Sequence, residues 1–454
     1  MTIEEFSSKI KGRSCSVVGL GISNLPLIDF LLGCGAKVVG RDRRTCDKME
    51  DVAATLEDKG VKLILGDDYL DNLREDYIFR TPGLRPDQPQ ILKAVEAGAI
   101  LSSEMELFFE LCPCRIIGIT GSDGKTTTST LTALILKEAG KRVWLGGNIG
   151  TPLLPHVAEM SGDDFVVVEL SSFQLMTMRR SPDVSIVTNI APNHLDWHTD
   201  MDEYVTSKEN IFLWPNNKKL ILRAEDEYAR SFADDARGEV DFISLTRAEA
   251  SGGSVIDGWL CYKGEKIIRE EDIKLVGWYN KEHYLSAIAA TYGYCKKEDV
   301  ERVAKTFGGV EHRLEFVREK DGVKYYNSSI DSSPSRTAAA LSAFDCKLIV
   351  ICGGYDKKIP FAPLAKALCE KAKKVILTGA TAGKIRASLE EEAKAGSELP
   401  EILEDPDFDR AIALAAGTAE SGDIVLLSPG CASFDAFPNF EVRGRRFKDL
   451  VNAL

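Results

Sequence analysis

The stretch from Ile116 to Thr130, IIGITGSDGKTTTST, holds residue types that could bind the phosphates of a nucleotide. An apolar run leads into Gly121 and Gly124, which let successive backbone N–H groups point at an anion. The helix expected next adds the positive end of its dipole. Lys125 could reach the outer phosphates, and Thr126 could place a hydroxyl on Mg²⁺, as in P-loop proteins. The stretch therefore predicts a nucleotide-binding turn.

The spacing departs from the strict pattern GxxxxGK[ST], because Ile119 stands in the place of the first glycine. A glycine-rich turn that only links a strand to a helix is the alternative. The phosphate-binding interpretation is favoured because the lysine, the hydroxyl residues and the apolar run coincide.

Carboxylate and imidazole side chains follow further along the chain. Glu169 closes the apolar run FVVVEL, where a magnesium-binding carboxylate is expected in nucleotide-binding sheets, although a capping or ion-paired glutamate would look the same. His194 and Asp196 lie in NHLDWH, and this histidine could be a nitrogen ligand for a second cation. Chance clustering of His194 and His198 in a polar loop remains the alternative.

Cationic side chains occur at three further places. Lys208 lies on an expected helix in DEYVTSKENIF, where a lysine is usually a solvated surface group. His312 and Arg313 open the last third of the chain, where a cation could reach a phosphate. Lys357 follows the glycines of CGGYDKK and could bind a carboxylate substrate or simply lie exposed.

Continuous apolar runs between helical stretches predict an α/β fold with parallel sheets covered on both faces. The pattern restarts near Cys112 and again near Gly309, which predicts a Rossmann-like domain at 1–111, a P-loop parallel-sheet domain at 112–309, and a Rossmann-like domain at 310–454. The charged stretch 216–274 is expected to be a peripheral subregion with short strands. In the first block Asn24 replaces the third glycine of the dinucleotide fingerprint, so another nucleotide diphosphate ligand is favoured over NAD.

The composition excludes several classes of protein. A net charge of -13 over 454 residues argues against nucleic-acid and anionic-membrane binding. The 11 cysteines show no zinc spacing and indicate free thiols in a reducing compartment. The sequence has neither a signal peptide nor a run of eighteen apolar residues, so we expect a cytoplasmic protein without membrane insertion.

The chain resembles the Mur ligases of peptidoglycan synthesis in the order and spacing of ITGSDGKTTT, GGNIG, ELSSFQL, NHLDWHTDMDEYVTSK, EHRLEF, GGYDKK and SPGCASFDAFPNFEVRG. The likeness spans all three predicted domains and is strongest to the family members that add D-glutamate. ELSSFQL and SPGCASFDAFPNFEVRG are the specific motifs, because the phosphate loop also occurs in other Mur ligases and in folylpolyglutamate synthases.

The resemblance implies an ATP-dependent ligase that joins D-glutamate to UDP-N-acetylmuramoyl-L-alanine through an acyl phosphate, acting as a monomer, with closure of the third domain during the cycle. It assigns contacts with the UDP substrate to Ile22, Ser23, Asp42, Arg43, Gly83 and Asn148. We also expect Ser171 and His312 to contact substrate. It assigns ATP to Gly121, Ser122, Asp123, Gly124, Lys125, Thr126 and Thr127, with Asn280 near the adenine and Arg313 on the phosphates. D-Glutamate would lie against Lys357, Ser433 and Phe440.

The same resemblance implies two magnesium ions, held by Thr126, Glu169 and His194. Lys208 matches the carbamylated lysine of the family, whose CO₂ adduct turns a cation into a carboxylate that can approach a metal. With Lys125, these groups form the expected catalytic set.

Three departures from the family pattern affect ligand contacts. The usual NDSKATN is here 327–333, NSSIDSS, so Ser328 replaces an aspartate and Ile330 replaces a lysine. His283 stands where an asparagine is usual, and Asp123 adds a negative charge beside the phosphates. The altered 327–333 loop supports one alternative of another class, a nucleotide-regulated binding protein without ligase activity. A different Mur ligase or a folylpolyglutamate-type enzyme is the alternative within the ligases.

Overall fold

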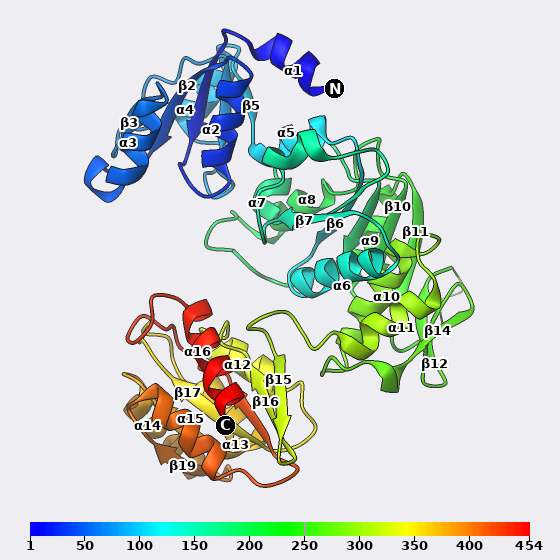
Figure 1. The fold of residues 1–454 in the computed structure, drawn as a ribbon, viewed down its shortest axis with the longest axis vertical. Coiled ribbons are helices and arrows are strands. Elements are labelled where there is room, and N and C mark those ends of the chain that lie inside the picture. Colours follow the sequence, from blue (N-terminus) through cyan, green and yellow to red (C-terminus); the bar gives the residue numbers. More distant parts are fainter. Residues whose placement is uncertain (249–250) are drawn as a thin grey trace. The chain divides into compact units, whose positions relative to one another are not determined.

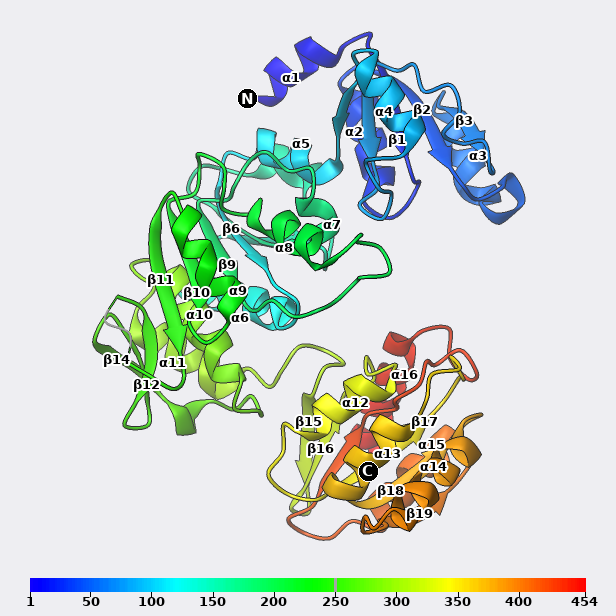
Figure 2. The same ribbon diagram turned by 180° about the vertical axis from the view of Figure 1, so that it is seen from behind.

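The computed structural model describes residues 1–248 and 251–454, which contain three sheets, each with packed helices (Figures 1 and 2). These described residues divide into two compact units, one of Met1–Arg269 with Lys281–Val303 and one of Glu270–Asn280 with Ala304–Leu454. The predicted α/β class with parallel sheets is confirmed. The boundaries at 111 and 309 remain predictions.

The first sheet is entirely parallel and has the order β3-β2-β1-β4-β5. Its strands are β1 (Ser14–Val18), β2 (Lys37–Asp42), β3 (Lys62–Leu65), β4 (Tyr77–Arg80) and β5 (Ile100–Ser102). The helices of this part are α1 (Ile3–Ile10), α2 (Asn24–Gly33), η1 (Cys46–Lys48), α3 (Glu50–Asp58), α4 (Pro89–Glu96) and α5 (Glu104–Leu111). Alternate residues of β1 enter opposite cores, Val17 with α2 and Val18 with α4, so helices cover both faces.

The second sheet has the order β14-β13-β12-β11-β10-β9-β6-β8-β7. Its strands are β6 (Arg115–Thr120), β7 (Val143–Gly147), β8 (Phe165–Glu169), β9 (Val184–Val187), β10 (Lys219–Arg223), β11 (Glu239–Ser244), β12 (Gly253–Ile256), β13 (Trp259–Tyr262) and β14 (Glu265–Arg269). Pairing is parallel from β7 to β12 and antiparallel from β12 to β14. The stretch 216–274, expected to be peripheral, therefore extends the main sheet before it ends in the antiparallel strands.

The helices between Lys125 and Thr306 carry several candidate site residues, among them Lys125, Thr126 and Lys208. They are α6 (Lys125–Glu138), η2 (Leu154–Glu159), α7 (Ser172–Leu175), α8 (Met201–Glu209), α9 (Glu227–Ser231), η3 (Phe232–Asp235), η4 (Glu270–Asp272), α10 (Asn280–Thr291) and α11 (Lys297–Thr306). Helix α6 packs across β6, β7 and β8. Because β6, β8 and β9 run parallel, the residues that follow their carboxyl ends meet at one edge of the sheet.

The third sheet has the order β15-β16-β20-β17-β18-β19, parallel except for β15. Its elements are β15 (Glu315–Lys320), β16 (Val323–Asn327), α12 (Pro334–Leu341), β17 (Leu348–Gly353), α13 (Ala362–Lys371), β18 (Ala372–Thr378), α14 (Ala382–Lys394), β19 (Glu401–Glu404), α15 (Phe408–Gly417), β20 (Ile424–Leu427) and α16 (Phe440–Ala453). In β17, Val350 packs with α12, α13 and α14, whereas Ile351 packs with α15 and α16. The opposite views in Figures 1 and 2 show these helices on the two faces. In the part of the chain that the structure describes, no helix has the length and apolarity needed to cross a bilayer.

Candidate functional site

The predicted phosphate loop is a tight turn between β6 and α6. Gly121 has φ +143°, and a Cβ there would lie 1.9 Å from the Thr188 hydroxyl, so only glycine fits. Asn189 fixes the turn, because its Oδ1 accepts hydrogen bonds from the backbone N–H groups of Ser122 (3.1 Å) and Asp123 (2.8 Å). The Asp123 side chain is exposed, so solvent screens the charge that this residue adds beside a phosphate.

His283, one of the departures from the family pattern, lies against the first turn of α6. Gly124 caps the helix with φ +76°, and a Cβ there would lie 2.1 Å from the His283 ring. The His283 Nδ1 is 3.1 Å from the Thr128 hydroxyl. His283 therefore packs directly on the predicted phosphate loop.

A buried carboxylate connects the loop to the neighbouring strands. Glu169, at the end of β8, is 2% exposed. Its Oε2 accepts a hydrogen bond from the Thr126 hydroxyl (2.8 Å), and its Oε1 accepts one from Asn148 Nδ2 (2.9 Å). Lys125 Nζ donates to the carbonyl oxygens of Gly121 and Ser122, both at 2.9 Å. The lysine, hydroxyl and carboxylate predicted for one site thus lie together at the carboxyl edge of the sheet.

Lys208 is a buried lysine rather than a solvated one. It is 1% exposed on α8, and its Nζ donates to the Gly121 carbonyl (2.8 Å) and the Thr120 hydroxyl (3.2 Å). Burial, with a smaller contribution from the charge of Lys125, lowers the pKa of Lys208 well below that of a free lysine. The geometry therefore places an amine of reduced basicity beside the phosphate loop.

His194 lies in the exposed loop after β9 and has φ +56°. Its ring packs edge-on against Phe173 of α7, with 4.9 Å between ring centroids. Among the described residues, no three His, Cys, Asp or Glu side chains are grouped to hold a metal ion. The assignment of His194 to a metal site, together with Thr126, Glu169 and Lys208, therefore remains a prediction.

Two cavities of the first unit contain the residues predicted for the UDP substrate. One cavity of about 470 Å³ is lined by Ile22, Ser23 and Asn148. The other, of about 420 Å³, is lined by Asp42, Arg43 and Gly83. Both include Thr81, so the turn after β4 borders the two cavities. Ser171 caps α7 by accepting a hydrogen bond from the N–H of Gln174, which lines the first cavity.

The carboxyl group of Glu104 also lines the larger of these cavities. It is 5% exposed, and Oε1 accepts a long hydrogen bond (3.4 Å) from the N–H of Leu154. Burial raises the pKa of Glu104 from 4.5 to about 7. The native state therefore holds this proton more tightly than the unfolded chain does, and stability is lost as pH rises from about 4.5 to about 7.

Replacing Glu104 with glutamine is expected to raise the free energy of unfolding by about 3 kcal/mol at pH 8.5 and to change it much less at pH 5. The amide has the size of the protonated acid and carries no charge to bury. Thermal unfolding at the two pH values measures the effect, with exposed Glu96→Gln as the control. An equal change at both pH values would contradict a pH-dependent burial cost.

In the second unit, Lys357, Ser433 and Phe440 border the carboxyl edge of the third sheet. Lys357 is exposed, and its Nζ lies 3.3 Å from the Ser332 hydroxyl. Ser433 is buried, and the preceding turn is fixed by Arg443, which donates to the carbonyl oxygens of Cys431 (3.1 Å) and Ala432 (3.2 Å). These contacts position the loop predicted for D-glutamate.

The altered 327–333 loop is ordered by contacts of its own. Asn327 Nδ2 lies 2.9 Å from His312 Nδ1, and the Ser329 hydroxyl donates to the Phe440 carbonyl (2.8 Å). Asp331 is buried and accepts a hydrogen bond from the Ser428 hydroxyl (2.8 Å), while burial raises the pKa of Asp331 to about 6. The loop 327–333 is therefore held by specific contacts even though its sequence departs from the family pattern.

The side chain of His312 is buried. It is 3% exposed, and burial lowers the pKa of its imidazole, which disfavours the charged ring. Arg313 is half-buried and remains the cation of the pair. Asn280, predicted near the adenine, begins α10 and donates a hydrogen bond to the Val276 carbonyl.

Several structurally important side chains were not singled out from the sequence: Arg80, Arg85, Glu104, Glu203 and Arg443. Arg443 lies within the motif SPGCASFDAFPNFEVRG, which was a usable signal. The contact between Arg85 and Glu203 joins positions 118 residues apart, so no local pattern indicates it.

Comparisons with known proteins match nearly the whole chain. A family model described as the Mur ligase middle domain matches residues 119–291, and one described as the Mur ligase, glutamate ligase domain, matches residues 312–431. A protein of Clostridium botulinum strain Hall, named UDP-N-acetylmuramoylalanine--D-glutamate ligase, is 47% identical over 99% of both chains. A protein of the same name from Clostridium novyi strain NT is 48% identical over 100% of this chain and 99% of its own.

Solved structures share the fold at lower identity. The UDP-N-acetylmuramate-alanine ligase MurC from Thermotoga maritima has a TM-score of 0.58 and 18% identity, covering 97% of this chain and 99% of its own. A pseudomurein peptide ligase type C from Methanothermus fervidus has a TM-score of 0.55 and 19% identity, covering 97% of this chain and 100% of its own. These likenesses extend to the multidomain α/β architecture.

Proposed function

This chain belongs to the Mur ligase family, and from its site we infer that it is an ATP-dependent ligase joining D-glutamate to UDP-N-acetylmuramoyl-L-alanine. One observation carries the assignment to the site. Glu169 bonds both Thr126 of the phosphate loop and Asn148 of the larger cavity, so one carboxylate borders the places of both substrates. A phosphoryl group and an acceptor carboxylate can therefore meet there.

The reaction proceeds in two steps. The γ-phosphoryl group of ATP is transferred to the carboxylate of the muramoyl-alanine, which gives ADP and an acyl phosphate. The amine of D-glutamate then attacks the acyl carbon, and inorganic phosphate and a proton leave as the amide bond forms. Phosphoryl transfer depends on positioning and on offsetting negative charge. The backbone N–H groups of the loop position the phosphates, and Lys125 offsets their charge.

Mg²⁺ fits the oxygen donors present. The Thr126 hydroxyl and the Glu169 carboxylate are hard ligands of the kind that hold this ion together with phosphate oxygens and water. Use of ATP with Mg²⁺ is general in the family, whereas two ions with His194 as a further ligand are our proposal. When bound, the ion would neutralise charge on the transferring phosphoryl group.

Carbamylation of Lys208 is proposed on the same geometry. Only an uncharged amine attacks CO₂, and burial of Lys208 favours that form. The resulting carbamate would be a carboxylate beside Glu169 and the loop, and would give the site a further oxygen donor. Monomeric state and cytoplasmic location stay predictions.

Release of ADP with UDP-N-acetylmuramoyl-L-alanine and a panel of amino acids tests the proposed function. Release with D-glutamate alone is expected. Release with another amino acid would indicate a different Mur ligase, and release with a folate and glutamate a folylpolyglutamate-type enzyme. Absence of release with every acceptor would indicate a nucleotide-regulated binding protein.

Replacing Lys357 with alanine is expected to raise KM for D-glutamate at least about tenfold, because a hydrogen bond to a charged group contributes about 1.5–3 kcal/mol. KM for ATP should stay within about twofold, because Lys357 is not among the residues assigned to ATP. Steady-state ADP release measures both constants, with exposed Lys366→Ala of α13 as the control. An equal rise in both constants would remove Lys357 from the amino-acid site.

A further inference from the structure

The turn Thr81–Leu84, which borders both substrate cavities, is fastened to helix α7 by a buried arginine. Arg80 is 1% exposed, and its Nη1 donates to the carbonyl oxygens of Pro82 (3.1 Å) and Leu84 (2.9 Å). Its Nη2 donates to the Phe173 carbonyl (2.9 Å). The turn therefore cannot shift without disturbing the helix that follows Glu169.

A second attachment joins this turn to the loop that carries His194. Trp197 Nε1 donates to the Gly83 carbonyl (2.9 Å), and Arg85 Nη1 donates to the Trp197 carbonyl (2.8 Å). The Arg85 guanidinium also lies over the Trp197 ring, 5.0 Å from its centroid. The loop is thus held through both the ring and the backbone carbonyl of Trp197.

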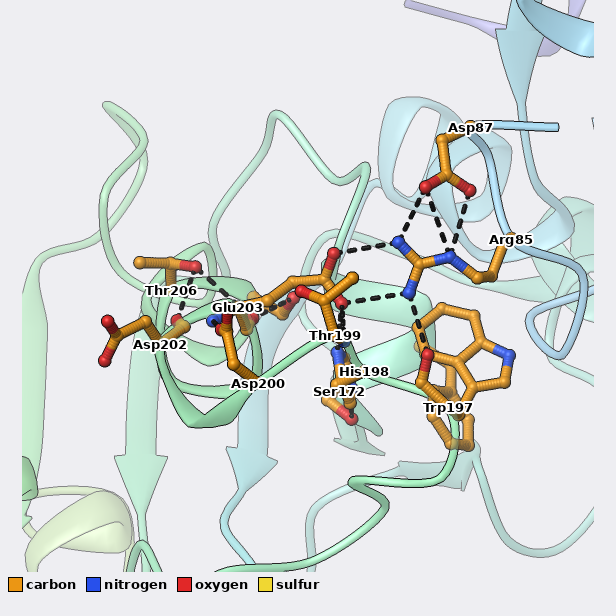
Figure 3. A network of polar contacts seen from close by, with 12 residues as sticks. Arg85, Asp87, Ser172, Trp197, His198, Thr199, Asp200, Asp202, Glu203 and Thr206 are labelled. Carbon is orange, nitrogen blue, oxygen red and sulfur yellow. Dashed lines mark hydrogen bonds and ion pairs between the residues drawn. The ribbon is translucent and has the colours of Figure 1, made fainter. Parts of the chain in front are cut away.

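Arg85 also binds the helix of Lys208. Its two terminal nitrogens donate to the two carboxylate oxygens of Glu203, at 3.0 and 2.9 Å (Figure 3). Such a paired arrangement fixes orientation as well as distance. The hydrogen bonds from Arg85 lower the pKa of Glu203 to about 2, so the pair is ionised in any ordinary assay buffer.

Glu203 extends the connection to α7 through a buried histidine. Its Oε2 accepts a hydrogen bond from the Thr199 N–H (3.0 Å) and lies 3.2 Å from His198 Nδ1. Because an ionised carboxylate only accepts hydrogen bonds, His198 Nδ1 donates to Glu203, and its Nε2 lies 2.9 Å from the Ser172 hydroxyl. Figure 3 shows Arg85, Glu203, His198 and Ser172 in this order.

We propose that Arg85 and Glu203 are positioning residues that keep His194 and Lys208 in register with the turn that contacts the UDP substrate. Glu203 precedes Lys208 on α8, the loop held by Trp197 and Thr199 carries His194, and Ser172 lies just after Glu169. The network therefore reaches the helix of Lys208, the loop of His194 and the helix that follows Glu169. This inference rests on the proposed function of those groups.

The alternative is that the ion pair only holds two sheets together. A comparison with Asp87 distinguishes this structural role from the positioning role. Arg85 pairs with Asp87 as well as with Glu203, with its Nη2 at 2.7 Å from the Asp87 carboxylate. Glu203 contacts the loop of His194, whereas Asp87 is half-exposed and precedes α4. Loss of either carboxylate removes one charge partner of the same arginine.

The test compares Glu203→Gln with Asp87→Asn. Mn²⁺ binding with a non-hydrolysable ATP analogue, followed by EPR, should weaken about 10- to 100-fold in Glu203→Gln, as for other groups that orient metal ligands. Its kcat should fall by a similar factor, whereas KM for the UDP substrate should stay within about twofold. Asp87→Asn should match the wild type. Arg85→Lys, which keeps the charge but not the paired geometry, should show the same changes as Glu203→Gln to a smaller extent.

Unchanged Mn²⁺ affinity and kcat in Glu203→Gln would overturn the proposal. Equal effects of Glu203→Gln and Asp87→Asn would also overturn it. The same holds if a lower melting temperature is the single change in Glu203→Gln. If Glu203→Gln fails to fold, the comparison of Arg85→Lys with Asp87→Asn decides by the same criteria. A wild-type protein without ligase activity would refute the proposed function instead, since the Mn²⁺ measurement does not need turnover.

Discussion

Replacing Lys208 with alanine is expected to lower the rate of ADP release about 10²- to 10³-fold, the usual loss when one preorganised electrostatic group is removed. Lys208 is buried and donates to the Gly121 carbonyl, so it is not a solvated surface lysine. Its carbamate would instead face the phosphates as an oxygen ligand. The measurement is ADP release with all substrates at saturation.

Partial recovery of the Lys208→Ala variant by high bicarbonate or a short carboxylate is the distinctive result. Removal of the side chain leaves space in which a small anion can stand in for the carbamate. Lys218→Ala, at a side chain that is 73% exposed, is the matched control and should behave as the wild type. An alanine variant that is active without any added anion would refute the carbamate role.

The strands of the candidate site were predictable because they are buried on both faces. The strand Phe165–Glu169 is apolar up to its last residue, and its parallel pairing with β6 brings Glu169 to the edge where the phosphate loop begins. The loop was predictable for a related reason, since Gly121 and Gly124 occupy positive-φ positions that other residues rarely adopt. Local chemistry determines both features.

Burial of Lys208 was not predictable from periodicity. Its helix is short and mostly polar, and the atoms that Nζ contacts belong to Thr120 and Gly121, 88 and 87 residues earlier. Here tertiary packing overrides the local pattern, and only the family resemblance indicated a role. The Arg85–Glu203 pair was not predictable for the same reason, because each residue alone is typical of a surface charge.

Other features had local signals that were not used. Helix α1 is capped by Thr2, which forms a capping box with Glu5, and the spacing of these two residues follows the sequence pattern of such a box. The strands β12, β13 and β14 pair partly by hairpins in a charged stretch, where alternation is weak. Their sequence therefore indicated short strands without indicating the sheet that they extend.

Replacing Glu169 with glutamine is expected to lower kcat about 10²- to 10³-fold while leaving the fold intact. The carboxylate is 2% exposed and bonded to the Thr126 hydroxyl and to Asn148 Nδ2. Glutamine has nearly the same volume, its carbonyl oxygen can accept from Asn148, and its amide can donate to the Thr126 oxygen. The variant therefore removes the negative charge and little else.

Three measurements on Glu169→Gln separate a metal-binding role from a structural one. The Mg²⁺ concentration for half-maximal rate should rise at least about tenfold, because the amide is a weaker ligand for a hard cation. Calorimetric affinity for UDP-N-acetylmuramoyl-L-alanine and the melting temperature should stay near those of the wild type. The control, Glu159→Gln, changes a side chain that is 57% exposed. A Glu169→Gln enzyme with wild-type kcat and Mg²⁺ requirement would exclude this carboxylate from metal binding, and loss of substrate affinity alone would assign it to the cavity instead.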